Sequence, residues 1–337
     1  MRRFRNKWVG IVAIIGMFIL ILKGSIAVTG VRKGIELCLH TVIPSLFPFL
    51  ILSGLMNSYF LGGKLSLLRP LGRLCKIPAG CEAILLTGLI GGYPVGAQCI
   101  YSAYKAGGVS KESAHRLLGF CNNAGPAFIF GMGASLFESP LVSWALWFIH
   151  IASAILTGIL LPGRKSIEST PIRSAPITLQ ESVESAIKTI AKICGWVVFF
   201  RVIISFLESV FPACRENYWP SLLYGVLELA NGIVKLSSAP SPLVRFICAS
   251  LMLSFGGICV GMQTASVCRE LKTGLYFTGK LLQTCISALL SVSLGVFIFP
   301  KPHLYKYSYA VLTAMAVSLT ILIVSQKKSG NLVNNRI

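Results

Sequence analysis

The chain has 337 residues, of which 54% are hydrophobic and only 12% are charged, and its mean hydropathy is +0.75. About a quarter of the residues of a soluble globular protein are charged, so this composition excludes soluble, disordered, fibrous and disulfide-stapled classes and predicts an integral membrane protein. The net charge of +20 comes mostly from Lys and Arg in short connections. We interpret this charge as contact with the headgroups of the lipid bilayer and not with nucleic acid.

The chain starts with an apolar run that follows four basic residues. This pattern resembles a signal peptide, but many further apolar segments follow, so we interpret residues 1–28 as an uncleaved membrane helix. About 20 apolar residues cross a bilayer core. The candidate spans in chain order are Trp8–Val28, Ile35–Phe60, Glu82–Tyr104, Arg116–Ala134, Leu141–Leu161, Ile187–Val210, Leu243–Val267, Tyr276–Phe299 and Tyr305–Ser325.

A polar stretch at residues 162–186 contains prolines and charged residues and divides the chain near its middle. We therefore predict a first membrane repeat at 29–161, a second at 187–325 and a polar tail at 326–337. The expected fold is all-α, a polytopic membrane protein with about 7–10 helical spans.

Two of these spans, Glu82–Tyr104 and Leu243–Val267, contain glycines at their centres, and the first also contains a proline there. Glycine and proline interrupt a helix. At 1.5 Å per residue, the arms on either side reach about half a bilayer. The two segments match at a constant offset of 256 − 91 = 165, so we predict two inverted repeats, each with a broken or re-entrant hairpin. The predicted break residues are Gly91, Gly92, Pro94, Gly96, Gly256, Gly257 and Gly261.

Polar residues near such breaks are candidates for a binding site, because irregular backbone at membrane depth packs on protein or lines a cavity. Asn122 and Asn123 precede a further break at Gly125 and Pro126, and we interpret the two amides as cavity lining; hydrogen bonding between helices is the alternative. Glu228 is costly in an apolar setting unless it is paired or faces water, although it could lie at the membrane interface. The predicted substrate-binding residues are Tyr93, Gln98, Asn122, Asn123, Glu228, Asn231 and Gln263.

Other kinds of site have little support. All 11 acidic residues are Glu, which excludes chemistry that needs Asp, such as an aspartyl phosphate. The cysteines form no Cys-x-x-Cys pair and the histidines are scattered, so we expect no metal site and no cofactor. Motifs of the common enzyme classes are missing from the sequence, and we expect no catalytic residues.

The motifs Gly92–Ala97, Ser110–Ala114, Phe120–Pro126 and Leu227–Gly232 resemble those of the YlbJ-like sporulation integral membrane proteins of endospore-forming bacteria. That group is placed in the nucleoside-recognition (Gate) domain superfamily, and the resemblance covers about Ile35 to Phe299. It implies paired hairpins around a central site, as in nucleoside and ferrous-iron transporters. The chain departs from many members at Gln98, where Lys is expected.

We therefore expect a multipass protein of the bacterial plasma membrane that acts as a transporter or permease for a small polar solute, a nucleoside being one candidate. The alternative is a non-transporting sporulation scaffold that acts through other sporulation membrane proteins or as a homo-oligomer. Ferrous-iron transport would require Cys121, Cys259 and Glu228 to meet in one cavity.

Overall fold

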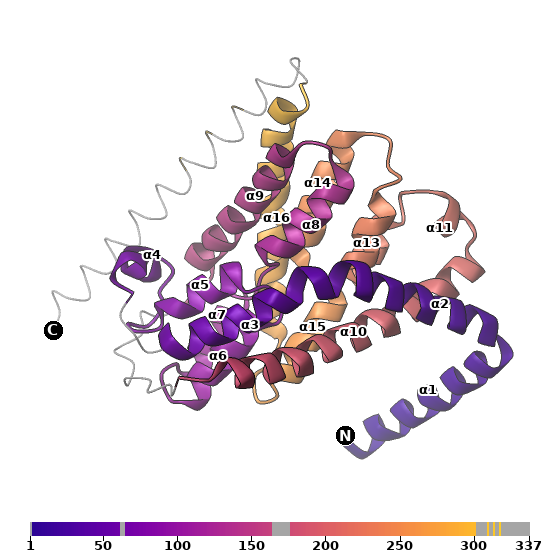
Figure 1. The fold of residues 1–337 in the computed structure, drawn as a ribbon, viewed down its shortest axis with the longest axis horizontal. Coiled ribbons are helices and arrows are strands. Elements are labelled where there is room, and N and C mark those ends of the chain that lie inside the picture. The colour runs from indigo at the N-terminus through magenta and orange to yellow at the C-terminus, as the bar shows by residue number, and fades with distance from the viewer. Residues whose placement is uncertain are drawn as a thin grey trace.

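The computed structural model describes residues 2–60, 65–163 and 176–300, together with Tyr309, Thr313 and Val317. Every regular element in this part of the chain is a helix (Figure 1). These residues confirm the prediction of an all-α polytopic membrane protein. Five segments are long and apolar enough to cross a membrane: Gly24–Phe60, Pro140–Leu160, Leu179–Val210, Pro242–Val267 and Gly274–Ile298. The predicted span Tyr305–Ser325 and the tail at 326–337 lie almost entirely outside the described residues.

The N-terminal helices differ from the predicted division at residue 28. Helix α1 (Arg2–Leu22) is followed by a break at Lys23, and α2 (Gly24–Leu37) continues through a π-helical turn, η1 (Cys38–Val42), into α3 (Ile43–Phe60). Arg32 and Lys33, which lie between the predicted spans Trp8–Val28 and Ile35–Phe60, are on the exposed side of α2. Helix α2 packs on α10 through glycine: a Cβ at Gly30 would lie 2.9 Å from Val202 Cα.

The first half of the remaining chain contains a hairpin, an interrupted helix and a long helix. The hairpin arms pack against each other and reverse direction at Gly91–Pro94, and the interruption spans residues 119–125. The elements are η2 (Ser66–Leu68), α4 (Arg69–Leu74), the hairpin α5 (Glu82–Ile90) and α6 (Val95–Lys105), the interrupted helix α7 (Lys111–Leu118) and α8 (Pro126–Leu136), and α9 (Pro140–Leu160).

The second half has a hairpin, an interrupted helix and a long helix in the same order. Its first helix, α10, starts eight residues before the predicted boundary at 187, because Thr178 and Glu181 form a capping box. The elements are α10 (Leu179–Val210), α11 (Ala213–Glu216), the hairpin α12 (Ser221–Leu227) and α13 (Leu229–Leu236), the interrupted helix α14 (Pro242–Phe255) and α15 (Gly257–Val267), and α16 (Gly274–Ile298).

We predicted a broken or re-entrant hairpin at Gly256, and the structure shows a broken helix that does not re-enter. Helices α14 and α15 continue in the same direction (Figure 1) and form one apolar segment of 26 residues. Gly256 and Gly257 have φ of +78° and +85°, a conformation that displaces the axis without reversing it and that glycine adopts readily. The offset of 165 therefore pairs the turn of one hairpin with the kink of a different element, and the hairpin of the second half turns at Glu228 instead.

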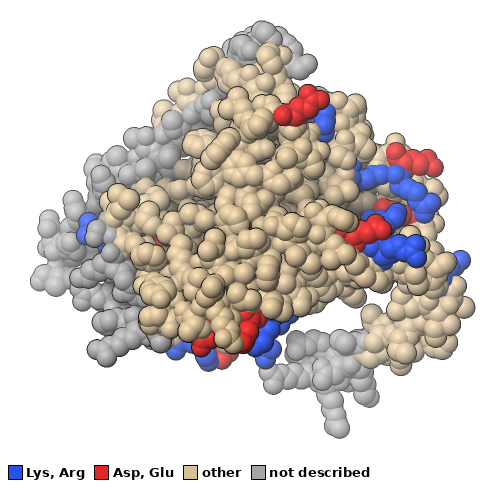
Figure 2. All heavy atoms as spheres, viewed as in Figure 1, with Lys and Arg blue, Asp and Glu red and all other residues tan. Residues whose placement is uncertain are grey.

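The turns and interruptions of both halves lie near the middle of the molecule (Figure 1). On the face shown in Figure 2, charged side chains gather near the edges and the broad central surface is formed by other residues. Such an uncharged band is what contact with the hydrocarbon core of a bilayer requires.

Candidate solute-binding core

Four places where the helical backbone is interrupted lie against one another, and glycine permits this approach. A Cβ at Gly125 would lie 3.0 Å from Gly92 Cα, which joins the first hairpin to the break between α7 and α8. A Cβ at Gly256 would lie 2.8 Å from the Tyr93 hydroxyl, and one at Gly257 2.9 Å from Gly225 O. The two hairpins and the two interrupted helices therefore share one centre.

A cavity of about 40 Å³ lies at this centre. One water needs about 10–15 Å³ of such volume, so the cavity accommodates a few waters, whereas sites for drug-sized ligands occupy about 300–1,000 Å³. The cavity is therefore too small for a ligand of that size in this conformation. Its lining residues are Val42, Leu46, Tyr93, Ala124, Gly125, Phe128, Ile193, Val197, Glu228, Leu229, Ala230, Val260 and Gln263.

Glu228 is the acidic residue of the cavity wall and is only 3% exposed. Its extended backbone ends α12, and its carboxylate caps α13 by accepting hydrogen bonds from the backbone N–H groups of Ala230 (3.1 Å) and Asn231 (2.7 Å). The side-chain amide of Asn231 donates a third bond of 2.7 Å to the same carboxylate. These donors and the positive end of the helix dipole stabilise the carboxylate without a basic partner.

A polar vestibule of about 450 Å³ lies on the other side of this contact. Asn231 lines the vestibule, while its partner Glu228 lines the cavity. This hydrogen-bonded pair therefore contributes one residue to the lining of each volume. The vestibule is lined by Lys33, Glu36, Leu37, Arg201, Glu208, Tyr224, Asn231, Val234, Lys235 and Ser238.

Asn122 and Asn123 connect helices instead of lining the cavity. Asn122 Oδ1 accepts a bond from Ala97 N–H (3.2 Å), and its amide donates to Thr264 Oγ1 (2.9 Å). Asn123 donates to Gly88 O (3.0 Å) and to Phe120 O. Both side chains are fully buried. The amides satisfy backbone groups freed by the break, so the helix-connecting alternative describes this conformation better than our cavity-lining interpretation.

The two predicted glutamines have different surroundings. Gln98 donates to Thr189 Oγ1 of α10 at 3.2 Å and does not line the cavity. Gln263 lines the cavity, and its amide nitrogen lies 3.4 Å from Cys259 Sγ. Of the seven predicted binding residues, Tyr93, Glu228 and Gln263 thus line the cavity and Asn231 the vestibule.

Lys280 on α16 was not among the predicted residues. It is fully buried, and its ammonium donates to Asn123 Oδ1 and to Gln283 Oε1, both at 2.9 Å. It also lies 5.3 Å from the ring centroid of Tyr93. A lysine inside an apolar span is costly, and this was the sequence signal that could have identified Lys280.

His150 on α9 is a second residue that the sequence analysis did not select. Its Nε2 accepts a hydrogen bond of 3.1 Å from Ala124 N–H, at the break between α7 and α8. Within the described residues, no group of three or more His, Cys, Asp or Glu side chains is placed to hold a metal ion.

The chain is similar to the sporulation integral membrane protein YlbJ of Bacillus subtilis strain 168, with 25% identity over 342 aligned positions. The similarity covers 86% of this chain and 83% of that protein. No protein-family model and no solved structure matches the chain. Together with the long apolar helices, this similarity identifies a multipass protein of a bacterial cell membrane.

Proposed function

We propose that this protein is a transporter or permease that moves a small polar solute across a membrane during sporulation, using a core of the nucleoside-recognition (Gate) type. The observation that carries the proposal is the small central cavity, at which four backbone interruptions meet and whose Glu228 is hydrogen-bonded to Asn231 in the lining of a wider vestibule. Such arrangements of broken helices are characteristic of secondary transporters. The sporulation role follows from the similarity to YlbJ.

In this proposal the solute enters the vestibule, and the α12–α13 hairpin moves so that the contact between Glu228 and Asn231 opens. The carboxylate, the amide of Gln263 and the ring of Tyr93 then face the solute. Hydroxyl groups and ring nitrogens, as in a nucleoside, suit these acceptors, donors and ring faces. The recurring order of hairpin, interrupted helix and long helix also leads us to infer an inverted repeat. No catalytic reaction is assigned to the chain.

The first experiment is a thermal-stability screen of the detergent-purified protein with nucleosides, bases, small organic acids and divalent metals. A ligand at about 100 times its Kd adds roughly 2.7 kcal/mol of stability, which raises the melting temperature. Any compound that does so is then tested for uptake into proteoliposomes.

The site is tested with Glu228→Gln and Asn231→Ala. Asn217→Ala, directly after α11, is the matched control because Asn217 is exposed and is not part of the cavity lining. We expect uptake to fall at least about tenfold in both core variants, which corresponds to about 1.4 kcal/mol, and to remain unchanged in the control. Equal uptake by all three variants would contradict the assignment of the cavity.

The small volume of the cavity favours one alternative, a non-transporting membrane scaffold for sporulation. In that case no compound raises the melting temperature, and sporulation of a deletion strain is restored by Glu228→Gln as well as by the wild-type chain. Restoration would then depend on exposed residues that contact partner proteins.

A further inference from the structure

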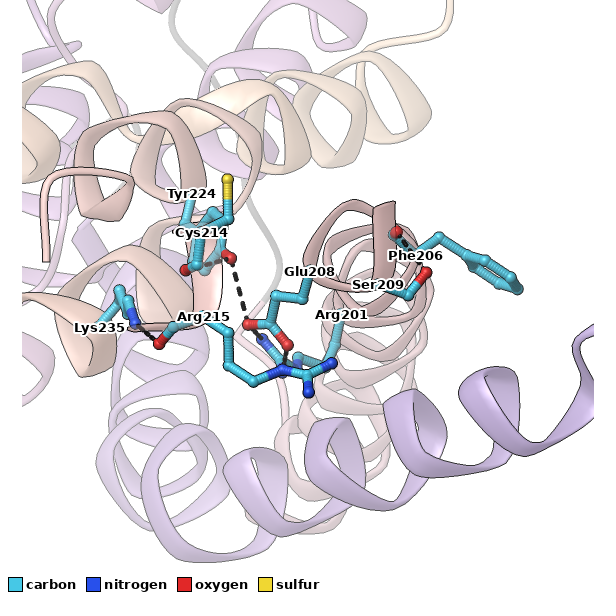
Figure 3. Close-up of polar contacts among 8 residues, drawn as sticks. All are labelled: Arg201, Phe206, Glu208, Ser209, Cys214, Arg215, Tyr224 and Lys235. Atoms are coloured by element: carbon cyan, nitrogen blue, oxygen red, sulfur yellow. Dashed lines mark hydrogen bonds and ion pairs between the residues drawn. The ribbon is translucent and has the colours of Figure 1, made fainter. Parts of the chain in front are cut away.

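A second polar hollow, of about 310 Å³, adjoins the vestibule and shares Lys33 and Glu208 with it. Helices α2, α10 and α11 form its walls. Figure 3 shows the side chains of Arg201 and Arg215 converging toward Glu208 from α10 and α11. The lining residues are Ser25, Ile26, Thr29, Lys33, Ser205, Glu208, Ser209 and Arg215.

The charges around this hollow favour an anion. Glu208 is already paired with Arg201, at 3.0 Å and 3.3 Å, and accepts a further bond from the Tyr224 hydroxyl at 3.2 Å. Lys33, Arg201 and Arg215 thus surround a single carboxylate, and this group has a net charge of 3 − 1 = +2. The neighbouring acid Glu36 lines the vestibule.

Two buried donors on neighbouring turns of α10 lack an acceptor. Ser205 is 5% exposed and lines the hollow, and its hydroxyl has no hydrogen-bond partner. The Nε of Arg201, one turn earlier on α10, is also buried without a partner. Because an unsatisfied buried donor is costly, this pattern indicates a ligand that supplies acceptor oxygens.

An apolar groove of about 770 Å³ lies between α1 and the adjacent faces of α2 and α10. Ala27 of α2 and Phe206 and Leu207 of α10 line the groove, whereas their sequence neighbours line the hollow. Tyr218 and Trp219, which follow α11, are 39% and 57% exposed, and such residues favour the membrane–water interface. The hollow is therefore at the depth of lipid headgroups.

We propose that this site binds an anionic phospholipid, with the phosphate held by Lys33, Arg215 and Ser205 and one acyl chain in the groove. A soluble phosphate would share the hollow but would not use the groove. The lipid site is separate from the cavity and does not depend on the proposed transport.

The test uses the full chain purified in detergent and measures the melting temperature while phosphatidylglycerol, phosphatidylcholine or inorganic phosphate is added. The site variant is Lys33→Gln with Arg215→Gln. The matched control is Lys188→Gln with Lys192→Gln, which removes two exposed charges from the other part of α10. Each basic residue near the surface contributes about 1 kcal/mol, so we expect phosphatidylglycerol to bind the site variant about thirtyfold more weakly than the control.

Equal stabilisation by phosphatidylcholine would overturn the anionic assignment. If inorganic phosphate stabilises the protein as much as phosphatidylglycerol does, the ligand is a soluble phosphate and the proposal of a lipid ligand is wrong. Equal phosphatidylglycerol affinity in the two variants would place the lipid elsewhere. If the double variant does not fold, the single variants Lys33→Gln and Arg215→Gln replace it, each with about a fivefold loss expected.

Discussion

Glycine allows the arms of the first hairpin to pack directly on the break between α7 and α8. A Cβ at Gly96 would collide with the carbonyl oxygen of Cys121, which belongs to the backbone and cannot turn aside. A Cβ at Gly131 on α8 would have no atom within 4 Å. The two glycines provide a matched pair for testing this contact.

We expect Gly96→Ala to lower the free energy of unfolding by about 1–3 kcal/mol, because the added methyl group forces the two segments apart. Gly131→Ala should be neutral or stabilise the protein by up to about 1 kcal/mol, as alanine favours a helix. Thermal and denaturant unfolding in detergent measure both. Equal stability of the two variants would show that the backbones do not touch at Cys121.

The contact between Lys280 and Asn123 couples α16 to the break after α7. Asn123→Leu removes one of the two acceptors of a buried ammonium, and we expect a loss of about 1–3 kcal/mol. Lys280→Met in the same background removes the charge that lost this acceptor, so the double variant should be more stable than Asn123→Leu alone. A double-mutant cycle of unfolding free energies measures this coupling, and additive losses would contradict it.

The sequence contained enough information to select some of these residues. Gly125 and Pro126 interrupt a helix through local backbone chemistry, and Glu228 is conspicuous in an apolar stretch. Lys280 lay inside an apolar run, and its partner Asn123 is 157 residues away, so nothing local specified the pair. The direction in which an amide points likewise depends on the distant groups that surround it.

At the scale of elements, the second hairpin depends on one carboxylate. Glu228 ends α12 and caps α13, so Glu228→Ala leaves three donors of Ala230 and Asn231 without their acceptor. We expect a loss of at least about 1–2 kcal/mol of stability. Glu228→Gln retains an acceptor oxygen and should lose less. Melting temperatures of the two variants test the cap, and a greater loss in Glu228→Gln would contradict it.

Element types were predictable only where local chemistry decides them. Adjacent glycines occur at Gly91–Gly92 and at Gly256–Gly257, yet the first pair reverses the chain and the second kinks a continuing helix. The difference arises from packing, since α5 and α6 contact each other while α14 contacts α16 and α9. The α12–α13 hairpin was missed because arms of seven and eight residues are too short to read as spans.

At the scale of the whole molecule, polar contacts connect the two halves. The Tyr93 hydroxyl donates to Leu253 O, and Lys105 at the end of α6 pairs with Glu270 before α16 at 2.8 Å. The hydrogen bond from Lys105 lowers the pKa of Glu270, and the same bond raises the pKa of Lys105. Both side chains are about half exposed, so the pair contributes modestly.

These shifts give a pH dependence with a definite sign. A lowered acid pKa stabilises the fold above the ordinary value of 4.5, and this contribution disappears as the pH falls through the folded value. The raised pKa of Lys105 stabilises the fold below 10.5 and loses its effect only at higher pH. At pH 7 the wild type should therefore melt above Glu270→Gln, and this difference should shrink as the pH falls below 4.5. Glu138→Gln is the charge-matched control, and a difference that does not shrink on acidification would contradict the pairing.

The composition predicted a membrane protein because the hydrocarbon core of a bilayer requires apolar residues along every span. It could not predict how the halves meet, since contacts such as Tyr93 with Leu253 join residues 160 positions apart.

The small central cavity also has an electrical consequence. A continuous file of water would let ions cross in response to the membrane potential, whereas about 40 Å³ holds only a few molecules. With Glu228 and Asn231 in contact, the core of the protein insulates in parallel with the surrounding lipid. A cell can therefore carry many copies without discharging its membrane.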